Sequence, residues 1–227
     1  MYCPQVWKPR LGVALVEVLC AIAMVFLLAS VMVGHFNARA AAHQTQCLLN
    51  LKESSLAFRS YANDNRDRLP MVVPMALGGA REAAVRGDLA RVFQSLSGEL
   101  ERPGHLICPA DNREPASDLG SLGRENVSYF LGVDARKEKP DSMLLGDRNL
   151  WSNDRARLLT GTYVVGSPAE DVGWSDERHR RSGNVAFSDG SAGNVDPNEL
   201  QRLLADAGGC HTRLLFPSSC SGNGVAR

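Results

Sequence analysis

The segment from Leu11 to Gly34 constrains the fold of this chain most, because it carries a single charged residue, Glu17. Its length exceeds the roughly 20 apolar residues that a membrane-spanning helix needs. A carboxylate inside hydrocarbon costs several kcal/mol unless it is paired, so Glu17 indicates a function and requires a partner.

Three interpretations of the N-terminus compete. Lys8 and Arg10 fit the basic region of a secretory signal peptide, but the apolar core is longer than the roughly 7–15 residues of such signals. Cys20 lacks the small preceding residues that a lipoprotein signal needs. An uncleaved signal anchor, with its basic leader in the cytoplasm, explains everything except Glu17.

Cleavage after Gly12 would explain Glu17. Val13 would then carry a new α-amino group, and Glu17, the fifth mature residue, can pair with the amine of a neighbouring copy. The segment resembles the N-terminus of type IV prepilins and type II secretion pseudopilins, although Leu11 separates Arg10 from the glycine and a valine replaces the usual phenylalanine. The resemblance implies cleavage by a prepilin peptidase and methylation at Val13.

The helical pattern continues beyond the apolar segment, since residues 37–62 contain neither proline nor glycine. An apolar or small stripe, broadened by Leu48 and Tyr61, predicts that this half packs on a globular head. Turn formers and Pro70 then predict the end of a helix that runs from Val13 to Ala62. The stripe consists of Cys47, Leu51, Ser55, Phe58 and Ala62.

This second half extends the resemblance. The runs at 46–52, 57–58, 61–65 and 68–70 look like the prepilin-type proteins numerous in Verrucomicrobia and Planctomycetes, which are similar in plan to the major pseudopilin of type II secretion. The expected fold is α+β and pilin-like, with a long N-terminal helix and a small antiparallel sheet. His43 is interpreted as a solvated polar residue.

Four regions are therefore predicted. They are a cytoplasmic leader (1–12), a transmembrane and assembly helix (13–36), the extramembrane half of the helix (37–65) and a globular head (66–227).

Within the head, Asp88 is predicted to cap a short helix. Strands are expected at 105–107, 127–132, 142–145 and 162–165, with a polar loop from 147 to 160. Asp189-Gly190 predicts the turn of a hairpin over 179–195. Asp196 is expected to cap a terminal helix over 197–207, with Leu200, Leu203 and Leu204 facing inward.

His179 stands ten positions before Asp189-Gly190, which matches the His-x9-Asp-Gly signature of the bacterial prepilin-type proteins. His179 and Asp189 are candidates for a metal site or for a pair across the hairpin. The favoured alternative is that Asp189-Gly190 forms the turn and His179 hydrogen-bonds nearby; the motif's role is left open.

The prediction of a calcium site rests on the resemblance. No ligand cluster with zinc spacing is visible. Related pseudopilins bind calcium through loop oxygens, which implies Asp111, Asp147, Asp176 and Asp189 as candidate hard ligands, although no EF-hand pattern is present. The expected cofactor is none or calcium.

Four cysteines lie outside the leader and the apolar segment, which allows three disulfide connectivities. Cys210 and Cys220 enclose a short loop and are the favoured pair, and Cys47 with Cys108 would then tie the helix to the head. Free thiols are the alternative for this second pair.

The favoured function is a structural subunit of a type IV pilus or a type II secretion pseudopilus. The resemblance implies an inner-membrane, single-pass protein with a periplasmic head that enters an extracytoplasmic filament. Its expected partners are a prepilin peptidase and N-methyltransferase, other pilin subunits, an assembly platform and membrane lipid. Nucleic acid is not expected, because Lys plus Arg and Asp plus Glu both total 25.

The alternative is a membrane-anchored enzyme or binding module. Ser188, Asp189 and His179 are suitable residue types for catalysis, but no nucleophile-elbow pattern surrounds them. The sequence therefore predicts no enzyme.

Overall fold

The computed structural model describes residues 15–152, 157–158, 161–165, 172–176, 178–179, 181–206 and 212–217. The predictions for Gly12, Val13, Cys210 and Cys220 lie outside these residues. The chain divides into a stem unit, Met1–Ala41, and a head unit, Ala42–Arg227. Each is described by itself.

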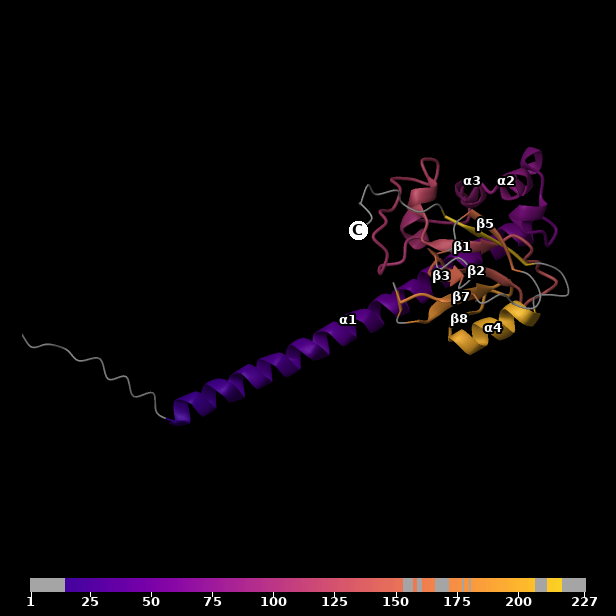
Figure 1. The fold of residues 1–227 in the computed structure, drawn as a ribbon. Helices are drawn as coiled ribbons and strands as arrows, with labels where there is room; N and C mark the ends of the chain where they lie inside the picture. The colour runs from indigo at the N-terminus through magenta and orange to yellow at the C-terminus, as the bar shows by residue number, and fades with distance from the viewer. Residues whose placement is uncertain are drawn as a thin grey trace, which may run out of the picture. The chain divides into compact units, whose positions relative to one another are not determined.

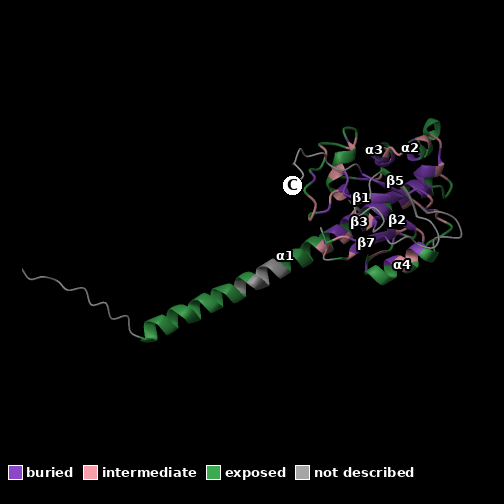
Figure 2. Cartoon of the chain, in the orientation of Figure 1, coloured by how far each residue is buried: buried purple, intermediate pink, exposed green. Residues whose placement is uncertain are grey.

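The described part of the stem unit belongs to helix α1 (Leu15–Asp64), which has 50 residues. Its large apolar side chains of described burial are exposed, including Phe26 at 71% and Leu28 at 67%, and this part of the helix is green in Figure 2. Among the residues that the structure describes, no helix combines the length and the apolar character that crossing a bilayer requires. The transmembrane segment expected over 13–36 stays a prediction.

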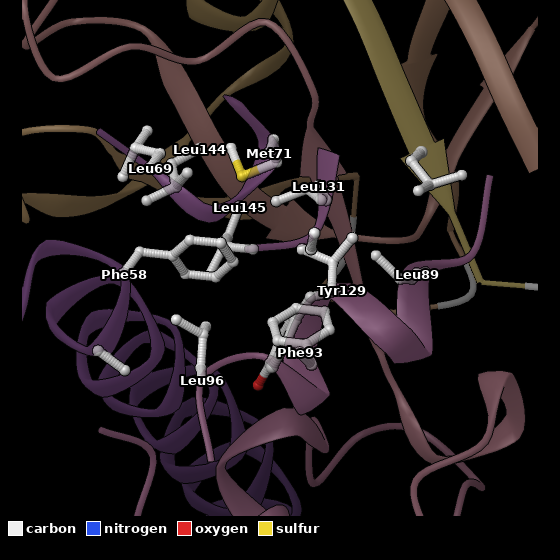
Figure 3. Packing of buried hydrophobic residues seen from close by; sticks show 14 of the residues in the cluster. Phe58, Leu69, Met71, Leu89, Phe93, Leu96, Tyr129, Leu131, Leu144 and Leu145 are labelled. Atoms are coloured by element: carbon white, nitrogen blue, oxygen red, sulfur yellow. The ribbon is translucent and has the colours of Figure 1, made fainter. Parts of the chain in front are cut away.

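The predicted stripe on the second half of α1 is confirmed. All five of its residues are fully buried within the head unit, whereas Leu49 on the same helix is 49% exposed. Phe58 packs edge-on against Phe93, with ring centroids 5.8 Å apart (Figure 3). The stripe is Cys47, Leu51, Ser55, Phe58 and Ala62.

The centre of the head unit is a six-stranded antiparallel sheet (Figure 1), which confirms the α+β class. Its order is β5-β9-β1-β2-β7-β8. In that order the strands are Gly161–Val165, Thr212–Phe216, Tyr129–Gly132, Met143–Asp147, Gly183–Phe187 and Ala192–Val195.

The two faces of this sheet pack on different layers, because alternate side chains of a strand point to opposite faces. Tyr129 and Leu131 join the core formed with α1, whereas Phe130 joins a second core with α4 (Pro197–Asp206). A register shift between Met143 and Leu145 interrupts the alternation in β2.

Smaller elements complete the two layers. On the α1 side lie α2 (Arg81–Arg86) and α3 (Leu89–Gln94), with 3-10 turns at Pro70–Val72, Met75–Leu77, Pro103–Leu106 and Arg124–Asn126. On the α4 side lies a three-stranded sheet ordered β4-β3-β6. Its strands are Arg157–Leu158, Leu150–Ser152 and Val172–Trp174.

Several local predictions are confirmed. Asp88 caps α3 by accepting a hydrogen bond from the Arg91 amide. The Asp196 carboxylate accepts from the amides of Asn198 and Glu199 at the start of α4. Leu200 and Leu204 of this helix are buried.

The strand predicted at 105–107 is wrong, because the 3-10 turn Pro103–Leu106 occupies most of it. Proline favours the first turn of a helix, and the carbonyl groups here bond to α1 rather than to a ladder. Asn50 Nδ2 donates to the Ile107 carbonyl at 2.8 Å, and Ser54 Oγ donates to that of His105 at 3.3 Å.

The polar loop predicted over 147–160 is also wrong, because it contains β3 and β4. Each strand has only two or three residues, so neither gives a clear alternation in the sequence. Leu150 is nevertheless fully buried, and it pairs with Trp174 of β6.

Candidate functional site

Four ligand-type side chains from distant parts of the sequence meet inside the head unit. Cys47 comes from the buried stripe of α1, and Cys108 from the turn after Pro103–Leu106. Asp147 ends β2, and His179 precedes β7. One donor atom from each lies within 4.8 Å of the other three. We call these four residues the Cys-Asp-His cluster.

Short contacts connect the four donor atoms in a chain. Cys47 Sγ donates to Asp147 Oδ1 at 2.9 Å. The other carboxylate oxygen, Oδ2, lies 3.4 Å from His179 Nε2, and this nitrogen is 3.3 Å from Cys108 Sγ. The side chains of His179 and Asp147 are only 2% and 1% exposed, so the cluster is closed to solvent.

Neighbouring groups fix the carboxylate within the cluster. The backbone amide and side-chain amide of Asn184 donate to Asp147 Oδ2 at 2.8 and 3.1 Å. The hydroxyl of Tyr129 lies 3.5 Å from Cys47 Sγ. The carboxylate is therefore oriented by strand β7, independently of the two cysteines.

The two cysteines of the cluster differ in acidity. The hydrogen bond with Cys47, followed by that with His179, lowers the pKa of the Cys108 thiol to about 6 despite its burial. Burial, followed by the hydrogen bond with Cys108, raises the pKa of Cys47. The Cys108 thiol is thus the more acidic of the two.

Opposing effects act on the other two members. Burial raises the pKa of Asp147, although the charge of His179 opposes that shift. Burial alone would lower the pKa of His179, but the hydrogen bond with Cys108 and the charge of Asp147 outweigh it and raise the pKa. The imidazole lies between the carboxyl group of Asp147 and the thiol of Cys108.

A group of three arginines adjoins the cluster in sequence and surrounds Asp111. Arg148 binds its carboxylate in a bidentate manner, at 2.8 and 3.0 Å. Arg178 Nη2 donates at 2.9 Å, and Arg113 Nε lies 3.6 Å away. Burial raises the pKa of Asp111, but Arg148 and then Arg178 outweigh it and hold the pKa below its usual range. We call this group the Asp111 arginine cage.

The residues of the His-x9-Asp-Gly motif lie in two separate parts of the head unit. His179 joins the cluster, with a positive φ of 50°, while Asp189 lies in the turn between β7 and β8 and accepts from the Ser191 amide and hydroxyl. Gly190 has φ 85°, and a side chain there would meet Arg59 of α1 at 2.9 Å. The turn predicted for Asp189-Gly190 is confirmed, and His179 contacts Asp147, not Asp189.

The four candidate calcium ligands have separate partners. Asp111 lies in its arginine cage, Asp147 in the cluster, Asp176 in an exposed ion pair with Arg181, and Asp189 in the hairpin turn. The cluster is the only group of three or more metal-ligand residues found among the residues that the structure describes. The calcium site stays a prediction without support from this geometry.

The remaining candidates from the sequence are the Cys47–Cys108 pair and Ser188. Cys47 and Cys108 are neighbours, as the predicted pairing requires, and both are free thiols. The Ser188 hydroxyl lies 2.8 Å from that of Ser142, so its partner is another serine and not the histidine that catalysis would need.

Sequence reasoning missed Asp147 as a partner of His179 and missed the cluster as a whole. The four residues come from four elements with no regular spacing between them, so no short motif marks them. A signal was present in part, because Cys47 and His179 each lie in a motif that carries the prepilin-type resemblance, and Cys108 was the suggested partner of Cys47. Only the fold brings these motifs to one place.

Comparison with known proteins finds no matching family model, no similar curated protein and no similar solved structure.

Proposed function

We propose that this protein is a structural subunit of a type IV pilus-like or type II secretion pseudopilus filament. The observation that carries the proposal is the contrast between the two parts of α1. The part in the stem unit exposes a continuous series of apolar side chains, while the part in the head unit buries its stripe in an α+β core.

Exposed apolar surface of this extent requires a cover, such as lipid or other helices. Glu17 lies in the first turn of α1, among exposed residues such as Leu15 and Val16. In an assembled bundle of such helices, the carboxylate of one copy would neutralise the α-amino group of Val13 on the next. The charge is then tolerated in an apolar environment because it is paired.

The head unit is suited to a passive role in such a filament. Its best-defined group of chemically reactive side chains, the Cys-Asp-His cluster, is closed to solvent, so a substrate has no access to it. The head would face outward and determine the surface of the filament.

Glu17→Gln is expected to reduce filament assembly at least about tenfold, the effect of ~1.4 kcal/mol per subunit contact. The variant keeps the shape of the side chain and removes the charge that pairs with the neighbouring amine. The chain is co-expressed with a prepilin peptidase and an assembly platform, and sheared filaments are quantified after ultracentrifugation.

Glu53→Gln is the matched control, because Glu53 is an exposed acid on the same helix but in the head unit. It is expected to assemble like the unaltered chain. Equal assembly of Glu17→Gln and the unaltered chain would contradict the proposed function.

A further inference from the structure

We propose that the Cys-Asp-His cluster is a structural zinc site that fastens α1 to the sheet of the head unit. The inference does not depend on filament assembly. It rests on the donor set, on its geometry, on its burial and on the charges around it.

The donor set suits zinc. Zn²⁺ favours thiolate sulfur and imidazole nitrogen and accepts carboxylate oxygen, usually with four ligands in structural sites. Calcium and magnesium favour oxygen donors only, and here two of the four donors are sulfur. The cluster offers two sulfurs, one nitrogen and one oxygen.

The geometry suits a tetrahedral ion. Zinc bonds of about 2.0–2.3 Å place neighbouring donor atoms of a tetrahedron about 3.3–3.8 Å apart. His179 Nε2 lies 3.3 Å from Cys108 Sγ and 3.4 Å from Asp147 Oδ2. Cys47 Sγ is 2.9 Å from Asp147 Oδ1, and all four donors lie within 4.8 Å of one another. Small side-chain adjustments are enough to admit the ion.

Second-layer contacts hold the donors in place, as is usual at metal sites. Asn184 fixes the Asp147 carboxylate with two hydrogen bonds. His179 has a left-handed backbone conformation, with φ 50°. Such a conformation is unfavourable for a residue with a side chain, and it persists only where the surrounding structure holds it in place. Ser182 stabilises this backbone by donating its hydroxyl to the His179 carbonyl at 2.6 Å.

The surrounding charge favours an anionic ligand set. Three guanidinium groups lie around the one carboxylate of Asp111, so the arginine cage places positive charge close to the cluster. Arg148 directly follows Asp147, and Arg178 directly precedes His179. Two thiolates and a carboxylate around Zn²⁺ leave one negative charge, which nearby guanidinium groups favour.

A disulfide between Cys47 and Cys108 explains less of the Cys-Asp-His cluster than a zinc ion does. It would use two of the four groups and leave Asp147 and His179 buried beside an apolar bond. A zinc ion engages all four, and it connects α1, the turn after Pro103–Leu106, strand β2 and the segment before β7.

The test measures zinc bound to the full chain, purified in detergent without chelator or reductant and dialysed against metal-free buffer. The expected result is about one zinc ion per chain, measured by inductively coupled plasma mass spectrometry. Cys108→Ser and His179→Gln are expected to reduce the content to less than about one tenth of that, since each removes a ligand.

Three control variants leave the cluster intact. Cys20→Ser alters an exposed thiol of the stem unit, and His43→Gln alters an exposed imidazole on α1. The double variant Cys210→Ser/Cys220→Ser removes the two C-terminal thiols. All three are expected to keep the full zinc content. Equal zinc in Cys108→Ser and in these controls would overturn the proposal.

A second measurement on the unaltered chain covers the case that the ligand variants do not fold. Cobalt substituted for zinc is expected to give thiolate-to-cobalt charge-transfer bands and the visible absorption of a tetrahedral site. Absence of these bands overturns the proposal, and so does a Cys47–Cys108 disulfide in the purified chain, identified by peptide mass analysis.

Discussion

Phe58→Ala is expected to lower the free energy of unfolding of the head unit by about 3–5 kcal/mol, the usual cost of removing a buried phenylalanine. Phe58 is fully buried and belongs to the same core cluster as Phe93 and Leu96, as Figure 3 shows. The substitution removes its edge-on contact with Phe93 and leaves a cavity in the core. The loss of unfolding free energy therefore measures how much the packing of α1 stabilises the head unit.

Urea unfolding of the full chain in a mild detergent measures this effect, followed by the fluorescence of Trp151 and Trp174 in the head unit. Leu49→Ala is the matched control, because Leu49 lies on the same helix and is 49% exposed. It is expected to cost less than about 1 kcal/mol. Similar losses for the two variants would show that α1 is not part of the head core.

Asp111→Asn is expected to destabilise the head unit by about 3–5 kcal/mol, the range for breaking a buried ion pair by removing one partner. Asp111 has a side chain that is 1% exposed, and Arg113 and Arg178 are 1% and 8% exposed. The amide cannot neutralise their charges, so both guanidinium groups would lose the buried carboxylate that faces them. The same urea measurement gives the loss, and Asp141→Asn, at an exposed turn, is the control.

The stability difference between the unaltered chain and Asp111→Asn is expected to depend on pH in one direction. The arginine cage holds the pKa of Asp111 below its usual range, so the ionised carboxylate favours the folded state. This contribution is complete above the unfolded pKa of about 3.9 and is lost as the pH falls through the lower folded pKa. A difference that shrinks between neutral pH and pH ~5 would contradict this assignment.

Local signals in the sequence predicted those parts of the fold that depend on neighbouring residues. The spacing of Cys47, Leu51, Ser55, Phe58 and Ala62 predicted the buried face of α1, and each of these residues is buried. The Asp196 cap and the Asp189-Gly190 turn could also be predicted, because each depends on nearby residues. A hydrogen bond from the Glu199 amide determines the cap, and a hydrogen bond from the Ser191 amide and the positive φ of Gly190 determine the turn.

The remaining features depend on contacts between distant residues. His105 and Ile107 look like strand residues, yet their carbonyls bond to Ser54 and Asn50 of α1. Strand β9 contributes two strand pairings, although the sequence was not predicted to form a strand over Thr212–Phe216. Such pairings are decided by the assembled sheet, not by local propensity.

The cluster illustrates the same limit for the site. His179 was recognised within a motif and Cys108 as a candidate disulfide partner. Their proximity arises because the turn after Pro103–Leu106 and the segment before β7 meet at Asp147, the last residue of β2. Asp147 was considered only as an oxygen ligand for calcium. Residues that the sequence placed in separate motifs therefore meet in one buried cluster, while Glu17 belongs to the separate question of assembly.

The mature N-terminus tests the central claim most directly. The full chain is co-expressed with a prepilin peptidase, isolated from membranes and examined by N-terminal sequencing and intact mass. The account predicts a chain that begins at Val13 with a methylated α-amino group, which places Glu17 at the fifth position. A chain that still begins at Met1 in the presence of active peptidase would contradict it.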